Sequence, residues 1–157
     1  VVSSYSKELS IPGERIGWIA VDPRAEDADG LIGAMILCTR TLGFVNAPAL
    51  MQRTVARLTD VTVDIEPYRR RRDMICEGLT DIGYELTPPS GTFYCFPKSP
   101  VADEMRLIEA LQEELILAVP GRGFGTPGHF RLSFCVPDKT IERSFDGFRR
   151  VYERLAG

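Results

Sequence analysis

Apolar side chains recur in the later part of the chain with the period of amphipathic helices. From Asp64 to Gly83 they return at spacings of three, four and seven residues, which predicts one helix of about five turns that Gly83 ends. A second stripe predicts a helix over 102–115, and a third predicts a closing helix capped by Asp138. The stripes are Ile65, Tyr68, Ile75, Leu79 and Ile82, then Leu107, Ile108, Leu111 and Leu115, then Ile141, Phe145, Phe148, Tyr152 and Leu155.

Short apolar runs bounded by turn residues predict strands between these helices. Proline and glycine at 88–91 and a glycine-rich stretch at 120–128 mark the turns. The expected strands cover 15–21, 84–86, 92–96, 116–119 and 130–134.

The earlier part of the chain is less periodic. Val1 and Val2 indicate a strand that runs into a hydroxyl-rich loop, and the apolar segment 31–37 indicates a short helix. Asn46 is a candidate N-cap, with Pro48 in the first turn of a helix that reaches about residue 58.

The order of these elements predicts the fold class. Helices outnumber strands and are separated from them along the chain, which favours an α+β fold with a small, mostly antiparallel sheet. The final helix, with its five large apolar residues, is expected to pack on that sheet.

Composition narrows the class of protein. With 157 residues, 44% hydrophobic and 26% charged, the chain suits a globular protein and not a disordered one. The net charge of -3, spread over both signs, argues against a nucleic-acid partner or a membrane surface, and no apolar run is long enough to span a bilayer.

Cysteine usage bears on metals and location. Four cysteines lie far apart and the chain has a single histidine, so zinc binding and a disulfide framework are both poorly supported and no metal is expected. Reduced, mostly buried thiols fit better, and we expect a cytoplasmic location. The chain opens on Val1 and begins like mid-domain sequence, so we also expect it to be a fragment.

One candidate site combines hydroxyls with two cations. The segment Ser3-Ser4-Tyr5-Ser6-Lys7 ends in a lysine that stands eight positions before Arg15. Hydroxyls and a bidentate guanidinium could hold phosphate oxygens, and a lysine can bind an aldehyde cofactor covalently. A polar loop with a solvated lysine explains the same residues.

A second candidate lies in the run Phe130 to Phe134, which contains Arg131. A charge inside an apolar strand is costly unless it is paired, so an inward arginine suggests a carboxylate partner from protein or substrate. An outward arginine on an alternating edge strand fits equally well. The neighbouring loop 120–128 has four glycines, but it has neither the phosphate-binding nor the dinucleotide-binding spacing, and His129 beside it has no visible catalytic partner.

Together these segments resemble the fold-type I aminotransferases that use pyridoxal phosphate, the class I/II or aspartate aminotransferase superfamily. The resembling runs are SYSK followed by PGERIG, then FVNAPALMQ, SGTFYCFP and PGRGFGTPGHFRLSF. They follow in the family's order along nearly the whole chain, and four motifs in order are more specific than any one of them.

The resemblance implies a role for each matching position. Lys7 would form the internal aldimine with pyridoxal 5'-phosphate and move the proton during catalysis, while Ser4, Ser6 and Arg15 would bind the cofactor phosphate. Arg131 would pair with the substrate α-carboxylate. Asn46 falls in the segment that family dimers present near the partner's active site, so a homodimer is also implied.

The family's domain plan implies that residues 1–58 end a large cofactor-binding domain and cross over, and that residues 59–157 form a small C-terminal domain. The substrates would be an amino acid and a 2-oxo acid. Aspartate-specific members carry an arginine near position 41 and a hydroxyl just before the asparagine, where this chain has Thr41 and Val45 beside Arg40, so an acidic substrate is not implied.

Several functions remain open at this point. In the family, other groups that contact the cofactor lie before the lysine, so we expect the isolated chain to fold without catalysing and without holding the cofactor firmly. A non-catalytic fragment or decayed relative that acts as a structural or dimerisation module is one alternative. Another fold-type I activity, such as a lyase or decarboxylase, is the other.

Overall fold

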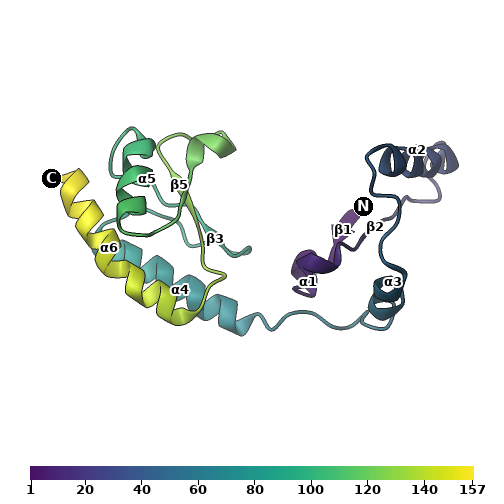
Figure 1. Ribbon diagram of the computed structural model, residues 1–157, viewed down its shortest axis with the longest axis horizontal. Coiled ribbons are helices and arrows are strands. Elements are labelled where there is room, and N and C mark those ends of the chain that lie inside the picture. The colour runs from purple at the N-terminus through teal and green to yellow at the C-terminus, as the bar shows by residue number, and fades with distance from the viewer. The chain divides into compact units, whose positions relative to one another are not determined.

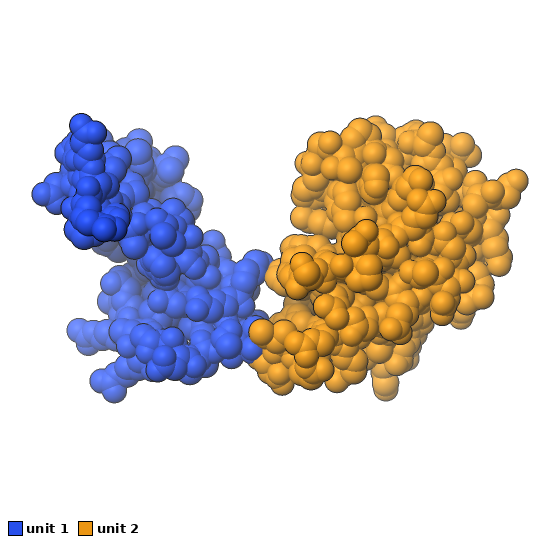
Figure 2. All heavy atoms as spheres, turned by 180° about the vertical axis from the view of Figure 1, so that it is seen from behind, with its two compact units in different colours: residues 1–63 blue, residues 64–157 orange.

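The computed structural model describes residues 1–157, which form two compact units, 1–63 and 64–157 (Figure 2). Helices and two small antiparallel sheets build the chain, which confirms the α+β fold class. The first unit contains β1 (Val2–Ser4), α1 (Tyr5–Glu8), the 3-10 helix η1 (Pro12–Glu14), β2 (Gly17–Ile19), α2 (Ala28–Thr41) and α3 (Ala49–Val55). The second contains α4 (Glu66–Ile82), β3 (Tyr94–Cys95), α5 (Glu104–Glu113), β4 (Val119–Pro120), the 3-10 helix η2 (Gly121–Phe124), β5 (Phe130–Ser133) and α6 (Asp138–Ala156).

The second unit is built on a three-stranded antiparallel sheet in the order β3-β5-β4. The register sets Cys95 opposite Leu132 and Pro120 opposite Phe130. The expected strands 92–96, 116–119 and 130–134 therefore share one sheet, although the first two are shorter than expected and β4 begins only at Val119. The central strand is β5.

A continuous hydrophobic core joins this sheet to the helices of the second unit. The helices α4 and α6 lie side by side in the ribbon (Figure 1), and their apolar stripes face inward because the 3.6-residue period keeps them on one side. Phe148 of α6 is buried in this core, which also contains residues of β3 and β5, but α6 packs mainly on α4 and α5 and less on the sheet than the sequence predicts. The largest fully buried apolar side chains are Leu79, Leu107, Leu111, Phe130, Phe134, Phe148 and Val151.

Helix beginnings differ from the sequence prediction. Asp138 is the first residue of α6 and not its N-cap, which is Pro137. The carboxylate of Asp138 accepts hydrogen bonds from Arg70 and Arg71 of α4 instead of capping backbone N–H groups. Ion pairing across two helices thus replaces the expected cap.

The prediction that Asn46 caps a helix is also wrong. The helix α3 begins at Ala49 after Pro48, whose ψ of 129° is extended, and no side chain caps it. Proline restricts the residue before it to extended conformations, so the chain cannot turn helical as early as position 47. Asn46 therefore stays in the loop between α2 and α3, and α3 ends at Val55, before the expected residue 58.

Two further strand predictions need correction. Residues 84–86 form no strand, because the Tyr84 N–H donates back to the Leu79 carbonyl of α4 at 3.0 Å and is not part of a strand ladder. The Tyr84 ring is buried, and its hydroxyl donates to the Phe148 carbonyl at 3.2 Å. The expected strand 15–21 is limited to Gly17–Ile19, since Arg15 adopts a left-handed conformation with φ of 51°.

The end of α5 departs from its stripe. Leu115 was expected on the apolar face, yet it lies beyond the helix, 91% exposed and with a φ of 59°. Its N–H donates to the Gln112 carbonyl and the N–H of Ile116 donates to the Leu111 carbonyl, both at 2.9 Å. This pair of bonds is the Schellman ending of a helix, which normally has glycine at the position of Leu115.

Replacing Leu115 by glycine is therefore expected to stabilise the second unit by about 1 kcal/mol, because the left-handed conformation strains a residue with a Cβ. Hydrogen exchange of the buried α6 amides measures the gain. Leu115→Ala is the matched control, since alanine removes the exposed side chain and keeps the Cβ. Equal gains in both variants would assign the effect to the lost apolar surface and contradict the strain argument.

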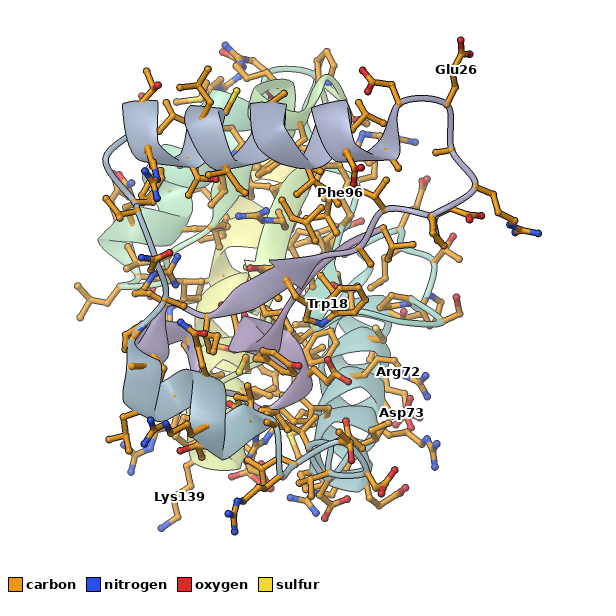
Figure 3. All side chains as sticks on the ribbon, turned by 90° about the vertical axis from the view of Figure 1, so that its right-hand side faces the viewer. Trp18, Glu26, Arg72, Asp73, Phe96 and Lys139 are labelled. Carbon is orange, nitrogen blue, oxygen red and sulfur yellow. The ribbon has the colours of Figure 1, made fainter.

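The first unit has little core of its own. Only Ile16 and Val55 are buried among its hydrophobic side chains. Trp18 on β2 is among the exposed ones (Figure 3). The exposed large apolar residues of this unit are Val1, Val2, Trp18, Ile19, Leu31, Ile32, Ile36, Leu37, Leu42, Phe44, Val45, Leu50 and Val61.

All four cysteines are free thiols, but only two are buried. Cys76 and Cys95 lie in the core of the second unit, while Cys38 and Cys135 are exposed, which corrects the expectation of mostly buried thiols. Burial raises the pKa of the Cys95 thiol to about 12, so it remains protonated at neutral pH. No helix is long and apolar enough to cross a membrane.

Candidate functional site

A two-stranded antiparallel pair holds the two ends of segment 4–17 together. The register of β1 and β2 sets Ser4 opposite Gly17. The Tyr5 N–H then donates to the Ile16 carbonyl at 3.2 Å, so that α1 begins directly beside β2. Residues that are distant in sequence thereby become neighbours at one end of this sheet.

Gly17 permits this close approach. A Cβ at that position would lie 2.6 Å from the carbonyl oxygen of Ser3 and 3.2 Å from the Cα of Ser4. Such contacts are too short for any side chain, so a residue other than glycine would push the strands apart. The glycine after the arginine is thus explained by local packing.

The lysine lies on a short turn of helix whose start is fixed by serine hydroxyls. Ser4 caps α1: its hydroxyl accepts a hydrogen bond from the Ser6 N–H at 3.1 Å and donates one to the Ser6 hydroxyl at 2.9 Å. Lys7 follows within the same turn with an exposed side chain. Two hydroxyls and an amine therefore lie within four residues, 4–7.

Arg15 lies near the other end of segment 4–17, between η1 and β2. Its guanidinium donates one hydrogen bond to the Pro12 carbonyl and makes no ion pair with a carboxylate of the chain. A guanidinium has five N–H donors, so most of them are available to an anion. Ser4, Ser6, Lys7 and Arg15 thus all lie on the segment 4–17 that the β1–β2 pair closes, and their joint role in binding a phosphate stays a prediction.

Arg131 lies on the central strand of the second unit. Phe130 and Leu132 on either side of it are buried, so strand alternation puts Arg131 on the face opposite the core. The sequence allowed an inward arginine or an outward one on an edge strand; the side chain faces away from the core, and the strand is central.

Two aromatic rings cover the Arg131 guanidinium. Its central carbon lies 4.3 Å from the ring centre of Tyr94 and 4.1 Å from that of Phe124. No carboxylate of the chain pairs with it. A cation–π contact does not use the N–H donors of a guanidinium as a hydrogen bond would, and a carboxylate can bind two of them in parallel.

Phe124 belongs to the glycine-rich loop, and a buried carboxylate holds that loop. Glu104 is the first residue of α5 and only 1% exposed. It accepts hydrogen bonds from the N–H, Nε and Nη2 of Arg122 at 3.2, 2.8 and 3.2 Å, and from the Gly128 N–H at 3.1 Å. Hydrogen bonds from Arg122, with that from Gly128, lower the Glu104 pKa to about 2, so the carboxylate stays charged.

The remaining candidates lie elsewhere. Asn46 is exposed in the loop between α2 and α3 and lines a cavity of about 390 Å³ within the first unit, together with Arg40 and Val45. Lys98 pairs with Glu85 at 2.9 Å, and Lys139 points outward from the ribbon (Figure 3), so neither has the hydroxyl-rich surroundings of Lys7. His129 is stacked on the ring of Phe96, at 5.8 Å between centres.

Sequence reasoning missed three residues of this arrangement: Glu104, Tyr94 and Phe124. Glu104 reads as an ordinary acidic residue in the first turn of a helix, where it is usually solvated. A weak signal was available, because Arg122 is the only charge in a loop that is otherwise glycine-rich.

Comparison with known proteins places these features in one class, the aminotransferases. Residues 1–148 match the family described as aminotransferase class I and II. An aspartate/prephenate aminotransferase of Thermus thermophilus is 43% identical over 91 residues, which cover 57% of this chain and 24% of that protein. A probable aspartate/prephenate aminotransferase of Thermus aquaticus is 31% identical over 97% of this chain and 40% of its own length.

A solved structure agrees with the sequence relatives. An aminotransferase from Eubacterium rectale matches the whole chain with a TM-score of 0.92 and 40% identity, and 39% of that structure is covered. The chain therefore belongs to the aminotransferase class I and II family, as the sequence motifs predict. It spans about 40% of the length of the relatives that it matches end to end.

Members of this family use pyridoxal phosphate, and the residues of the first unit fit that group. The Lys7 amine suits its aldehyde, and the hydroxyls of Ser4 and Ser6 with the Arg15 guanidinium suit its phosphate. The close approach of β1 and β2 at Gly17 holds the two ends of the segment that carries these groups together.

Proposed function

We propose that this chain forms the C-terminal part of a pyridoxal-phosphate-dependent aminotransferase that moves an amino group between an amino acid and a 2-oxo acid. The observation that carries the proposal is the pairing of β1 with β2, which sets Ser4 opposite Gly17 and so closes the segment 4–17 that contains Lys7 and Arg15. Family membership over residues 1–148 supports the same reaction class.

Each residue has a defined task in this proposal. When bound, pyridoxal phosphate withdraws electrons from the substrate Cα and so makes its proton removable. The Lys7 Nζ would hold the cofactor through its aldehyde carbon between turnovers, and during turnover this amine would accept the proton that leaves the substrate Cα and return it to the reaction centre. Ser4, Ser6 and Arg15 bind the phosphate and keep that carbon within reach of the amine.

Substrate recognition is assigned to the second unit and to the loop after α2. Arg131 binds the α-carboxylate shared by the amino acid and the 2-oxo acid, which its aromatic cover and free edge support. Asn46 contributes to substrate binding in a homodimer. Residues 1–58 are assigned to the large cofactor-binding domain and its crossover, and residues 59–157 to the small domain.

Covalent labelling tests the assignment of Lys7. We expect borohydride reduction of the full-length enzyme with pyridoxal phosphate to fix the cofactor on Lys7, located by peptide mass spectrometry. The 157-residue chain alone is expected to label weakly, because Lys7 and Arg15 are exposed to water there. A label on Lys98 or Lys139 would overturn the assignment, and no specific label on the full-length protein would favour a non-catalytic module.

A further inference from the structure

The aromatic cover of Arg131 depends on a buried carboxylate that does not touch it. Phe124, on one face of the guanidinium, lies on η2 at the start of the loop 121–128. That loop is rich in glycine, and a free loop of this composition would sample many backbone conformations. Something must therefore hold the ring at 4.1 Å from the arginine.

Glu104 connects both ends of that loop to one point. Its two oxygens accept hydrogen bonds from Arg122, just before Phe124, and from the N–H of Gly128, where the loop returns to β5. Asp103 adds a hydrogen bond from the same guanidinium at 2.7 Å. A charged group 1% exposed is costly to bury unless all its bonds are made, so the loop must keep this conformation for the carboxylate to be satisfied.

Backbone contacts remove the remaining freedom of the loop. Gly121 donates to the His129 carbonyl at 2.7 Å, and the Thr126 N–H donates back to the Gly121 carbonyl at 3.0 Å. A Cβ on Gly121 would lie 2.2 Å from the Thr126 oxygen, so the turn is closed around that glycine. The result is a rigid loop whose only large apolar side chain, Phe124, is directed onto Arg131.

We propose that Glu104 is a positioning residue for substrate recognition: by fixing loop 121–128 it holds Phe124 against Arg131 and so presents the guanidinium edge to the substrate carboxylate. The proposal rests on the assignment of Arg131 to the α-carboxylate. Tyr94, the second ring, lies on β3 and needs no such tether, because β3 is paired with β5. Preorganisation of this kind improves binding, since the orientation of the arginine is fixed before the substrate arrives.

Two variants separate positioning from general stability. Glu104→Gln keeps the size of the side chain but loses the charge that the Arg122 guanidinium binds. Phe124→Leu removes the ring and leaves the carboxylate untouched, and because Phe124 is 46% exposed this variant keeps the fold even if Glu104→Gln does not. Glu109→Gln on the exposed side of α5 is the matched control.

The first measurement needs no activity. In the 157-residue chain, we expect the NMR signal of the Arg131 Nε–H to be shifted by the two rings that lie close to its guanidinium. We expect this shift to shrink toward that of a solvated arginine in Glu104→Gln and in Phe124→Leu, and to stay unchanged in Glu109→Gln. An unmoved Arg131 signal in a folded Glu104→Gln chain would overturn the proposal, whatever the reaction of the whole enzyme.

The second measurement uses the full-length enzyme. We expect Glu104→Gln and Phe124→Leu to raise KM for the amino acid about tenfold with kcat changed less than about twofold, the loss expected for a cation–π contact and its orientation. An amine substrate without an α-carboxylate should react equally well with variant and parent. Equal losses for both substrates would mean that Glu104 serves only stability, and an inactive parent with a displaced Arg131 signal would contradict the aminotransferase assignment alone.

Discussion

Replacing Lys7 by alanine is expected to lower transamination by the full-length enzyme by about 10⁴-fold, the upper range for losing a positioned acid–base group. The substrate and cofactor can still bind, because Ser4, Arg15 and Arg131 remain. The Cα proton then has no carrier, since no other amine shares this short turn with the serine hydroxyls. Single-turnover kinetics, followed by the absorbance of the bound cofactor, measure the loss.

Lys98→Ala and Lys139→Ala serve as controls for that result. Both lysines are exposed in the second unit, and Lys98 already pairs with Glu85. We expect both variants to keep the parent kcat. If Lys7→Ala retained more than a small fraction of the parent rate, the proton would have another carrier and the catalytic assignment of Lys7 would be wrong.

Elements of the fold that depend on local periodicity could be predicted from the sequence. The helices α4, α5 and α6 were expected because their apolar residues return every three or four positions and must be buried together. Their ends were less predictable. Asp138 satisfies arginines of another helix instead of its own backbone, and Leu115 takes a conformation usually left to glycine. Both depend on contacts or strain that a local pattern does not contain.

The candidate site also has a part that could be predicted from the sequence and a part that could not. Lys7, Ser4 and Arg15 lie within one short segment, so their neighbourhood could be inferred from sequence, and β1–β2 pairing agrees with it. The surroundings of Arg131 could not be. Its cover joins Tyr94 with Phe124, and the tether of Phe124 reaches back to Glu104, so three separate segments must fold before the arrangement exists.

Arg131→Lys is expected to lower kcat/KM of the full-length enzyme about 100-fold for amino acids and 2-oxo acids, mainly by raising KM. A lysine keeps the positive charge but cannot offer two parallel N–H donors to a carboxylate. Nor does its compact ammonium have the planar surface that the guanidinium offers to the rings of Tyr94 and Phe124. Steady-state kinetics with both substrates measure the change.

The control for Arg131→Lys is Arg149→Lys, an exposed position on α6, which should leave both parameters unchanged. An amine lacking the α-carboxylate provides the complementary control, because the Arg131→Lys variant should process it as the parent does. If instead KM for the amino acid were unaffected, Arg131 would not bind the carboxylate. The rings of Tyr94 and Phe124 would then only shield the Arg131 charge. The next candidate for the cation that binds the substrate carboxylate would be Arg40, which lines the cavity beside Asn46.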